Sequence, residues 1–105
     1  MLATYHAATP VIAAYYIGDT IDTGAYGHNA DRSEMRIALA PLEEKHDYYS
    51  WAWYHTESVN VTPNLVPVAT TETYTPTNKG YYYCVITNHY NDDTAQVTSK
   101  FIYVV

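Results

Sequence analysis

The chain has 105 residues, of which 48% are apolar and 15% are charged, and its formal net charge is −6. This length is typical of a single domain with one hydrophobic core, and this composition excludes an intrinsically disordered chain. The five Lys and Arg residues are scattered, which excludes the basic stripe of a nucleic-acid-binding protein. We therefore expect one globular domain, residues 1–105, as a module of a larger protein that binds no nucleic acid.

The sequence contains no apolar run of membrane-spanning length, and its first six residues lack the basic flank and apolar centre of a signal peptide. We therefore expect no membrane insertion, and a larger parent protein or a virion would have to carry the domain outside a cell. Cys84 is the only cysteine, so no internal disulfide can form and packing must supply the stability.

The first third of the chain predicts two strands separated by a long loop. Residues 10–17 are apolar without a helical stripe and predict an edge strand that begins after a proline. Two glycines among small polar residues predict a loop over residues 22–32, the longest in the chain. Residues 35–40 alternate and predict a second strand, ended by Pro41. Its inward side chains are Met35, Ile37 and Leu39.

The middle of the chain predicts one long strand between irregular segments. Residues 42–47 are charged, and a solvated connection is favoured there over a short helical turn. Residues 48–56 predict a strand dense in aromatic residues, and residues 70–75 predict a threonine-rich strand. Residues 59–68 contain two prolines and predict short edge pieces. On the long strand Tyr49, Trp51 and Trp53 share one face.

The last third predicts a hairpin. Residues 81–87 read as a buried strand with Tyr82, Cys84 and Ile86 on its inner face. Residues 88–93 are polar except for one tyrosine and predict the connection to a final strand over residues 94–105. The whole pattern of about seven short strands without a helix predicts an all-β antiparallel sandwich or barrel.

The stretch from Asn78 to Cys84 resembles a motif of immunoglobulin-like domains. Asn78, Gly80, Tyr82 and Cys84 occupy the places of the Asp-x-Gly-x-Tyr-x-Cys pattern of strand F. Trp53, 31 residues upstream of Cys84, resembles the tryptophan of strand C. Residues 85–88 and 95–99 look like the following hairpin in immunoglobulin-like modules of bacterial surface and phage structural proteins.

This resemblance covers residues 35–105 and implies an immunoglobulin-like antiparallel β-sandwich of about seven strands. It gives Tyr82 the role of a tyrosine corner, whose hydroxyl bonds back to the preceding turn. The strand-B cysteine is missing, with Leu39 or an adjacent alanine in its likely place, so the inter-sheet disulfide is absent. The same residues also predict a core without the family, because Leu39, Trp53, Tyr82 and Cys84 would form an apolar plug between two sheets.

Several residues invite a chemical interpretation, and each has a structural alternative. Cys84 is a candidate nucleophile or metal ligand, but its position within an inward-facing strand predicts core packing. The histidines lack the close spacing of zinc ligands, so we expect them to be exposed loop residues. They are His6, His28, His46, His55 and His89.

Two further patterns are short. Residues 91–93, with Asp19 and Asp22, offer oxygen ligands for calcium, but they lack the regular spacing of a calcium loop, and we favour the interpretation that they are turn residues. Residues 60–62 match the N-glycosylation acceptor, which matters only in a eukaryotic secretory setting.

The surplus tyrosines point outward. Tyr48, Tyr54, Tyr81 and Tyr83 should lie on outer faces of strands, and exposed tyrosine is frequent in recognition surfaces. The alternative is that these tyrosines pair across strands and stabilise the sheet. If they bind, the candidate binding residues are Tyr26, His28, Tyr81, Tyr83, His89 and Tyr90.

The resemblance implies a non-enzymatic interaction or structural module of a bacterial surface protein or a phage virion protein. Its expected partners are neighbouring domains, capsid or tail proteins and host-surface glycans or proteins, at the virion or bacterial cell surface. The alternative is an ancillary carbohydrate-binding or spacer domain of an extracellular hydrolase. No nucleophile–base pair, metal set or phosphate loop can be named, so we expect no enzymatic activity and no cofactor.

Overall fold

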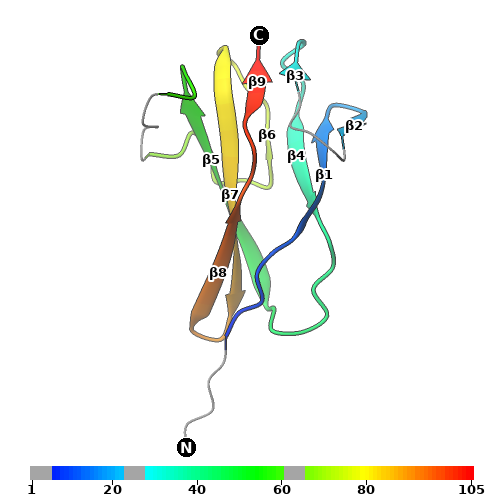
Figure 1. Cartoon of the computed structure of the whole chain (residues 1–105), viewed down its shortest axis with the longest axis vertical. Helices are drawn as coiled ribbons and strands as arrows, with labels where there is room; N and C mark the ends of the chain where they lie inside the picture. Colours follow the sequence, from blue (N-terminus) through cyan, green and yellow to red (C-terminus); the bar gives the residue numbers. More distant parts are fainter. Residues whose placement is uncertain (1–5, 23–27, 61–65) are drawn as a thin grey trace, which may run out of the picture.

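The computed structural model describes residues 6–22, 28–60 and 66–105, which form two β-sheets and no helix (Figure 1). One sheet has the order β2-β1-β4-β6. Its strands are β1 (Ile12–Ile17), β2 (Thr20–Asp22), β4 (Met35–Leu39) and β6 (Thr73–Tyr74). The other sheet has the order β3-β9-β7-β5, with β8 paired to the second half of β7. Its strands are β3 (His28–Asn29), β5 (Tyr48–Thr56), β7 (Gly80–Tyr90), β8 (Asp93–Thr98) and β9 (Ile102–Val104).

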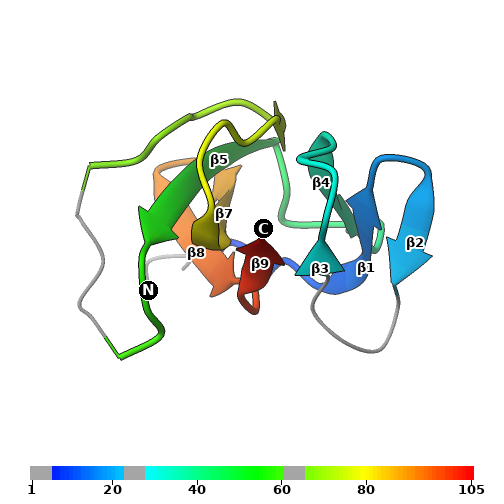
Figure 2. The same ribbon diagram turned by 90° about the horizontal axis from the view of Figure 1, so that it is seen from above.

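The two sheets form the layers of a sandwich-like fold. Seen from above, β5, β7, β8 and β9 lie on one side and β1, β2 and β4 on the other (Figure 2). Side chains of β7 alternate between buried and half-buried along the strand, as expected for a sheet with one packed face. The core between the layers consists of Tyr15, Met35, Ile37, Trp53, Tyr82, Cys84, Ile86, Ile102 and Val104. The all-β prediction is therefore confirmed.

The predicted core plug is present. Trp53 and Cys84 are direct partners across β5 and β7, and both are completely buried. Leu39 is partly buried and packs against the same cluster. The Tyr82 hydroxyl donates a 2.7 Å hydrogen bond to the Asn78 carbonyl, which is the bond to the preceding turn that the resemblance implies.

Several boundaries differ from the sequence prediction. The strand predicted at residues 10–17 is not at the edge, because β2 folds back and covers its outer side. The predicted loop over residues 22–32 contains β3, which pairs in parallel with β9; residues 23–27 lie outside the described part of the chain. The strand predicted at residues 70–75 is reduced to the two residues of β6.

The final hairpin is tighter than predicted. His89 and Tyr90 are not in a connection but continue β7, and Tyr90 pairs with Asp93. Only Asn91 and Asp92 form the turn, with Asn91 in the left-handed region at a φ of 53°. Asparagine tolerates this conformation better than most residues, which explains why the turn can be this short.

The predicted last strand is divided by a β-bulge. Paired residue numbers of β7 and β8 sum to 183, as in Val85 with Thr98, whereas those of β7 and β9 sum to 184, as in Tyr82 with Ile102. One extra residue therefore lies between β8 and β9. The Ser99 hydroxyl accepts the Cys84 N–H at 2.8 Å, and the Lys100 N–H donates to the Tyr15 hydroxyl at 2.9 Å. The bulge turns Val97 on one side of it and Ile102 on the other toward the same core.

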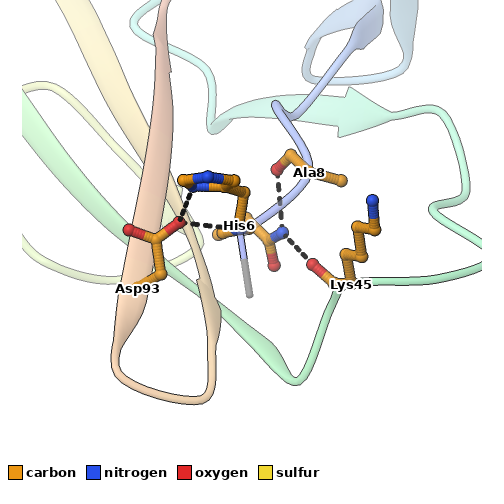
Figure 3. Close-up of polar contacts among 6 residues, drawn as sticks. His6, Ala8, Lys45 and Asp93 are labelled. Atoms are coloured by element: carbon orange, nitrogen blue, oxygen red, sulfur yellow. Dashed lines mark hydrogen bonds and ion pairs between the residues drawn. The ribbon is translucent and has the colours of Figure 1, made fainter. Parts of the chain in front are cut away.

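Asn88 binds the first described residues to the end of the sandwich that contains the β7–β8 turn. Its side chain is completely buried, and its amide donates to the carbonyls of Ala8 at 2.8 Å and Lys45 at 2.9 Å. Asp93 accepts the Ala7 N–H at 2.7 Å and lies 3.8 Å from the His6 ring nitrogen (Figure 3). The contacts of Asn88 with Ala8 and of Asp93 with Ala7 join residues 80 and 86 positions apart, and they close this end of the fold.

Candidate functional site

Aromatic side chains gather on the outer face of the five-stranded sheet. The register places Tyr54 opposite Tyr83, and Tyr81 opposite Tyr103. Their ring centroids lie 5.2 Å and 4.9 Å apart. Phe101 contacts both Tyr81 and Tyr83 edge-on, at 5.9 Å and 5.7 Å. We call the following set the aromatic face: His28, Tyr54, Tyr81, Tyr83, Phe101 and Tyr103.

The sequence produces this face through two local features. The alternation of β7 sends Tyr82 and Cys84 inward, so Tyr81 and Tyr83 must point outward. The bulge at Lys100 then shifts the alternation of the last strand, which turns Phe101 and Tyr103 outward beside them. His28 joins the face because β3 pairs with β9, and its ring lies 5.5 Å from that of Tyr103.

Two clefts flank Tyr81. One, of about 380 Å³, is lined by Glu57, Lys79, Gly80, Tyr81 and Tyr103. The other, of about 340 Å³, is lined by Val59, Tyr81, Ser99, Lys100 and Phe101. Tyr81 thus lies between the two clefts, and each cleft has an aromatic wall and a lysine side chain. A ligand with flat apolar faces and polar edges fits this combination of surfaces.

The local charge at the clefts differs from that of the chain. The chain has a net charge of −6 and only five Lys and Arg residues. Two of its three lysines, Lys79 and Lys100, line the clefts beside Tyr81. Salt screens exposed charges beyond about 8 Å at physiological ionic strength, so a bound group senses these lysines more than the distant acids.

Three of the candidate binding residues lie together. Tyr81, Tyr83 and His28 belong to the aromatic face, and the first two are half-buried by its stacking contacts. Tyr26 lies outside the described residues. His89 and Tyr90 belong to the opposite end of β7, where His89 stacks on Tyr48 at 4.3 Å. The predicted set is therefore divided between the two ends of one sheet.

The prediction that all the histidines are exposed loop residues is wrong. His55 and His89 lie in strands, half-buried. His55 packs on Tyr82 and bonds to the Lys79 carbonyl at 3.0 Å, and His89 bonds to Ser50 at 2.8 Å. His46, also half-buried, bonds to the Asn88 side chain at 2.5 Å. His89 has ring neighbours because β7 continues to Tyr90, further than the sequence predicts, whereas His55 lies within the strand predicted over residues 48–56 and faces the rim of the core there.

Metal binding receives no support from the geometry of the described residues. No three His, Cys, Asp or Glu side chains among them lie close enough to hold an ion. Asp93 accepts a hydrogen bond from the Ala7 N–H. The β7–β8 turn, which contains Asn91, lies at the opposite end of the molecule from the β1–β2 turn, which contains Asp19 (Figure 1). The acidic residues proposed for calcium are therefore not brought together, and the end of the glycosylation triplet at residues 61–62 lies outside the described residues.

Cys84 is buried as predicted. Desolvation raises the pKa of its thiol from 9.0 to about 12, with a smaller opposing effect from a hydrogen bond to the Ala52 backbone. The thiol is therefore protonated at neutral pH and unsuited to nucleophilic attack, which requires an accessible thiolate. None of the described residues forms a helix that is long and apolar enough to cross a membrane.

Of the residues that line the clefts, sequence reasoning named only Tyr81 as a binding candidate. It missed Glu57, Val59, Lys79, Gly80, Ser99, Lys100, Phe101 and Tyr103. Phe101 and Tyr103 lie in the strand predicted over residues 94–105, for which the sequence prediction gives no inner or outer face. A single alternation along that strand cannot bury both Val97 and Ile102. That conflict was itself the signal of a bulge. Glu57 and Lys79 follow and precede strands, and only the packing of the two segments brings them to one cleft.

Comparison with known proteins identifies no relative: no protein-family model, no curated protein and no solved structure matches the chain. The functional interpretation must therefore rest on the residues and geometry described above.

Proposed function

We propose that the chain is a non-enzymatic, immunoglobulin-like binding module that contacts surface glycans through its aromatic face. The observation that carries the proposal is the contiguous set of aromatic rings on the outer side of β5, β7 and β9, with clefts on both sides of Tyr81. Aromatic rings stack on the apolar faces of sugar rings, and polar side chains at cleft edges bond to sugar hydroxyls.

The strand order supports the immunoglobulin-like part of the proposal. β1, β4 and β6 lie in the order of strands A, B and E, while β5, β7 and the β8–β9 pair lie in that of strands C, F and G. The bond from Tyr82 to Asn78 has the form of a tyrosine corner. The chain departs from that pattern in its two-residue β6 and in the additional strand β2.

We propose the virion or the bacterial cell surface as the location, on the resemblance of residues 85–88 and 95–99 to modules of such proteins. Neighbouring domains or capsid and tail proteins would then hold the module. A blot of virions and cell-envelope fractions with an antibody to the chain tests this location. A signal in neither fraction would contradict this location.

The second candidate function is an ancillary carbohydrate-binding domain of an extracellular hydrolase. Such a domain would bind glycans through the same aromatic face but would belong to a different kind of parent protein.

The binding proposal is tested with the purified chain on an immobilised panel of neutral and acidic glycans. We expect saturable binding that the double variant Tyr81→Ala/Tyr83→Ala loses. Tyr48→Ala is the matched control, because Tyr48 is 59% exposed and stacks on His89 away from the clefts. A cooperative thermal transition of each variant would show that it is folded. Equal binding by the double variant and the parent chain, or no binding to any glycan, would refute the proposal.

A further inference from the structure

The two clefts beside Tyr81 differ in charge. The cleft with Lys79 also contains Glu57, so a carboxylate and an ammonium group share it. The cleft with Lys100 is lined otherwise by Val59, Tyr81, Ser99 and Phe101, and none of the described residues contributes a carboxylate to it. Only the Lys100 cleft therefore combines a positive charge with walls that are mainly apolar.

The bulge presents Lys100 at this cleft. Lys100 is the extra residue between β8 and β9, and its N–H is held at 2.9 Å by the hydroxyl of Tyr15 from the opposite sheet. Its carbonyl accepts a 2.9 Å hydrogen bond from the Ser99 hydroxyl. Bulges commonly redirect a side chain next to a binding site. The backbone of Lys100 is thus fixed on both sides, while its side chain is exposed at the rim.

We infer that the Lys100 cleft selects a sugar unit that carries a carboxylate, as uronic and sialic acids do. This inference rests on the proposed glycan binding and adds the chemical class of the ligand. The apolar face of the sugar ring would pack on Tyr81 and Phe101, and its carboxylate would pair with the Lys100 ammonium group. Hydroxyls of a neighbouring sugar unit would then contact Glu57 and Lys79 in the cleft on the other side of Tyr81.

The electrostatic argument is local. An acidic ligand is repelled weakly by a chain of net charge −6, but screening limits that repulsion at physiological salt. A carboxylate in the Lys100 cleft gains a charge-assisted contact, and the described residues of this cleft include no competing carboxylate. A carboxylate in the other cleft would lie beside Glu57 and be repelled.

Titration calorimetry with matched probes tests the inference. The pairs are sialyllactose with lactose, and trigalacturonate with its methyl ester, which keeps the ring and removes the charge. We expect an acidic probe to bind about fivefold more tightly than its neutral partner, the upper range for one exposed ion pair. Lys100→Met should abolish this preference, so that each acidic probe and its neutral partner bind with equal affinity.

Lys45→Met is the matched control, since it removes the same charge from the exposed connection after β4 and outside both clefts. The Lys45→Met variant should retain the preference for the acidic probes, and high salt should reduce that preference in this variant and in the parent chain. The inference is overturned if neither acidic probe binds more tightly than its neutral partner, or if Lys100→Met keeps the preference. Neutral-glycan binding that Tyr81→Ala/Tyr83→Ala removes would then leave the proposed function standing, whereas a chain that binds no probe and no glycan would refute both.

Discussion

Trp51 and Trp53 lie two residues apart on one face of β5 but have different environments. Trp53 is completely buried, and its indole N–H donates a 2.9 Å hydrogen bond to the Thr71 carbonyl. Trp51 is half-buried, and its indole nitrogen is covered without a hydrogen-bond partner among the described residues. The difference arises because the short β6 leaves the inner face near Trp51 incompletely covered, next to a cleft lined by Arg36 and Glu72.

Trp53→Ala should lower the free energy of unfolding by about 3–5 kcal/mol, because it creates a cavity in the centre of the core. Trp51→Phe should cost less than about 1.5 kcal/mol, since it keeps an aromatic ring and removes a donor that has no described partner. Urea denaturation of both variants measures these changes. A larger loss for Trp51→Phe than for Trp53→Ala would contradict the assignment of the central tryptophan.

The raised pKa values of Cys84 and Tyr82 predict a loss of stability at alkaline pH. Burial raises the pKa of Cys84 from 9.0 to about 12 and that of Tyr82 from 10.0 to about 12, the latter with a further contribution from the nearby Tyr74. Above about pH 9 the unfolded chain loses these protons first, so the contribution of the two groups to the unfolding free energy should be constant below that pH and fall as the pH approaches 12. Urea denaturation at about pH 8 and about pH 11 measures the decline. Cys84→Ala should reduce it, and an unchanged decline in this variant would exclude the thiol as a cause.

At the scale of the element, β7 is the central strand of the five-stranded sheet. It pairs with β5 along one side, and with β8 and β9 in succession along the other. Gly80, at the start of this strand, has a φ of 137°, and a Cβ there would lie 2.4 Å from the His55 ring and 3.0 Å from the Thr56 carbonyl. The glycine of the sequence motif is therefore required both by its conformation and by the closeness of β5.

The other end of β7 depends on Asn88. Asn88→Ala should cost about 1–3 kcal/mol, because it leaves the carbonyls of Ala8 and Lys45 without their amide donor. The Ala8 N–H, bonded to the Lys45 carbonyl at 3.1 Å, should exchange with solvent faster in the variant. Hydrogen exchange read by NMR measures this, with Thr87→Ala on the opposite face of β7 as the control. Unchanged protection of Ala8 would show that other contacts hold this segment.

At the scale of the whole molecule, contacts between distant residues hold the fold together. β3 and β9 pair residue 28 with residue 103, and Asp93 binds Ala7 across 86 positions. The hairpin of β7 and β8 is the longest local pairing. Since β3 must meet β9, which lies 75 residues later in the chain, before the five-stranded sheet is complete, loop closure opposes folding until late.

This topology predicts slow folding. Refolding from urea should take roughly milliseconds to seconds, as is typical of sandwiches dominated by long-range pairing. Stopped-flow tryptophan fluorescence measures the rate, because Trp53 becomes completely buried on folding. Refolding in microseconds would mean that local contacts, such as the β7–β8 hairpin, govern the transition state.

The sequence by itself determined the features that depend on near neighbours. The alternation around Cys84 predicted which side chains of β7 are buried, and Trp53, Tyr82 and Cys84 were correctly identified as core residues. The outward direction of Tyr81 and Tyr83 followed from the same alternation. These predictions succeed because a strand's period of two is set within the strand itself.

Only the tertiary structure decided the features that need distant partners. The parallel pairing of β3 with β9 brings His28 to the aromatic face, and nothing within residues 28–29 encodes it locally. The bulge at Lys100 is fixed by Tyr15 from the other sheet, and the clefts combine residues 57–59, 79–81 and 99–103. The partners of a half-buried strand are selected by packing over the whole core, which is why the candidate site became complete only in the folded chain.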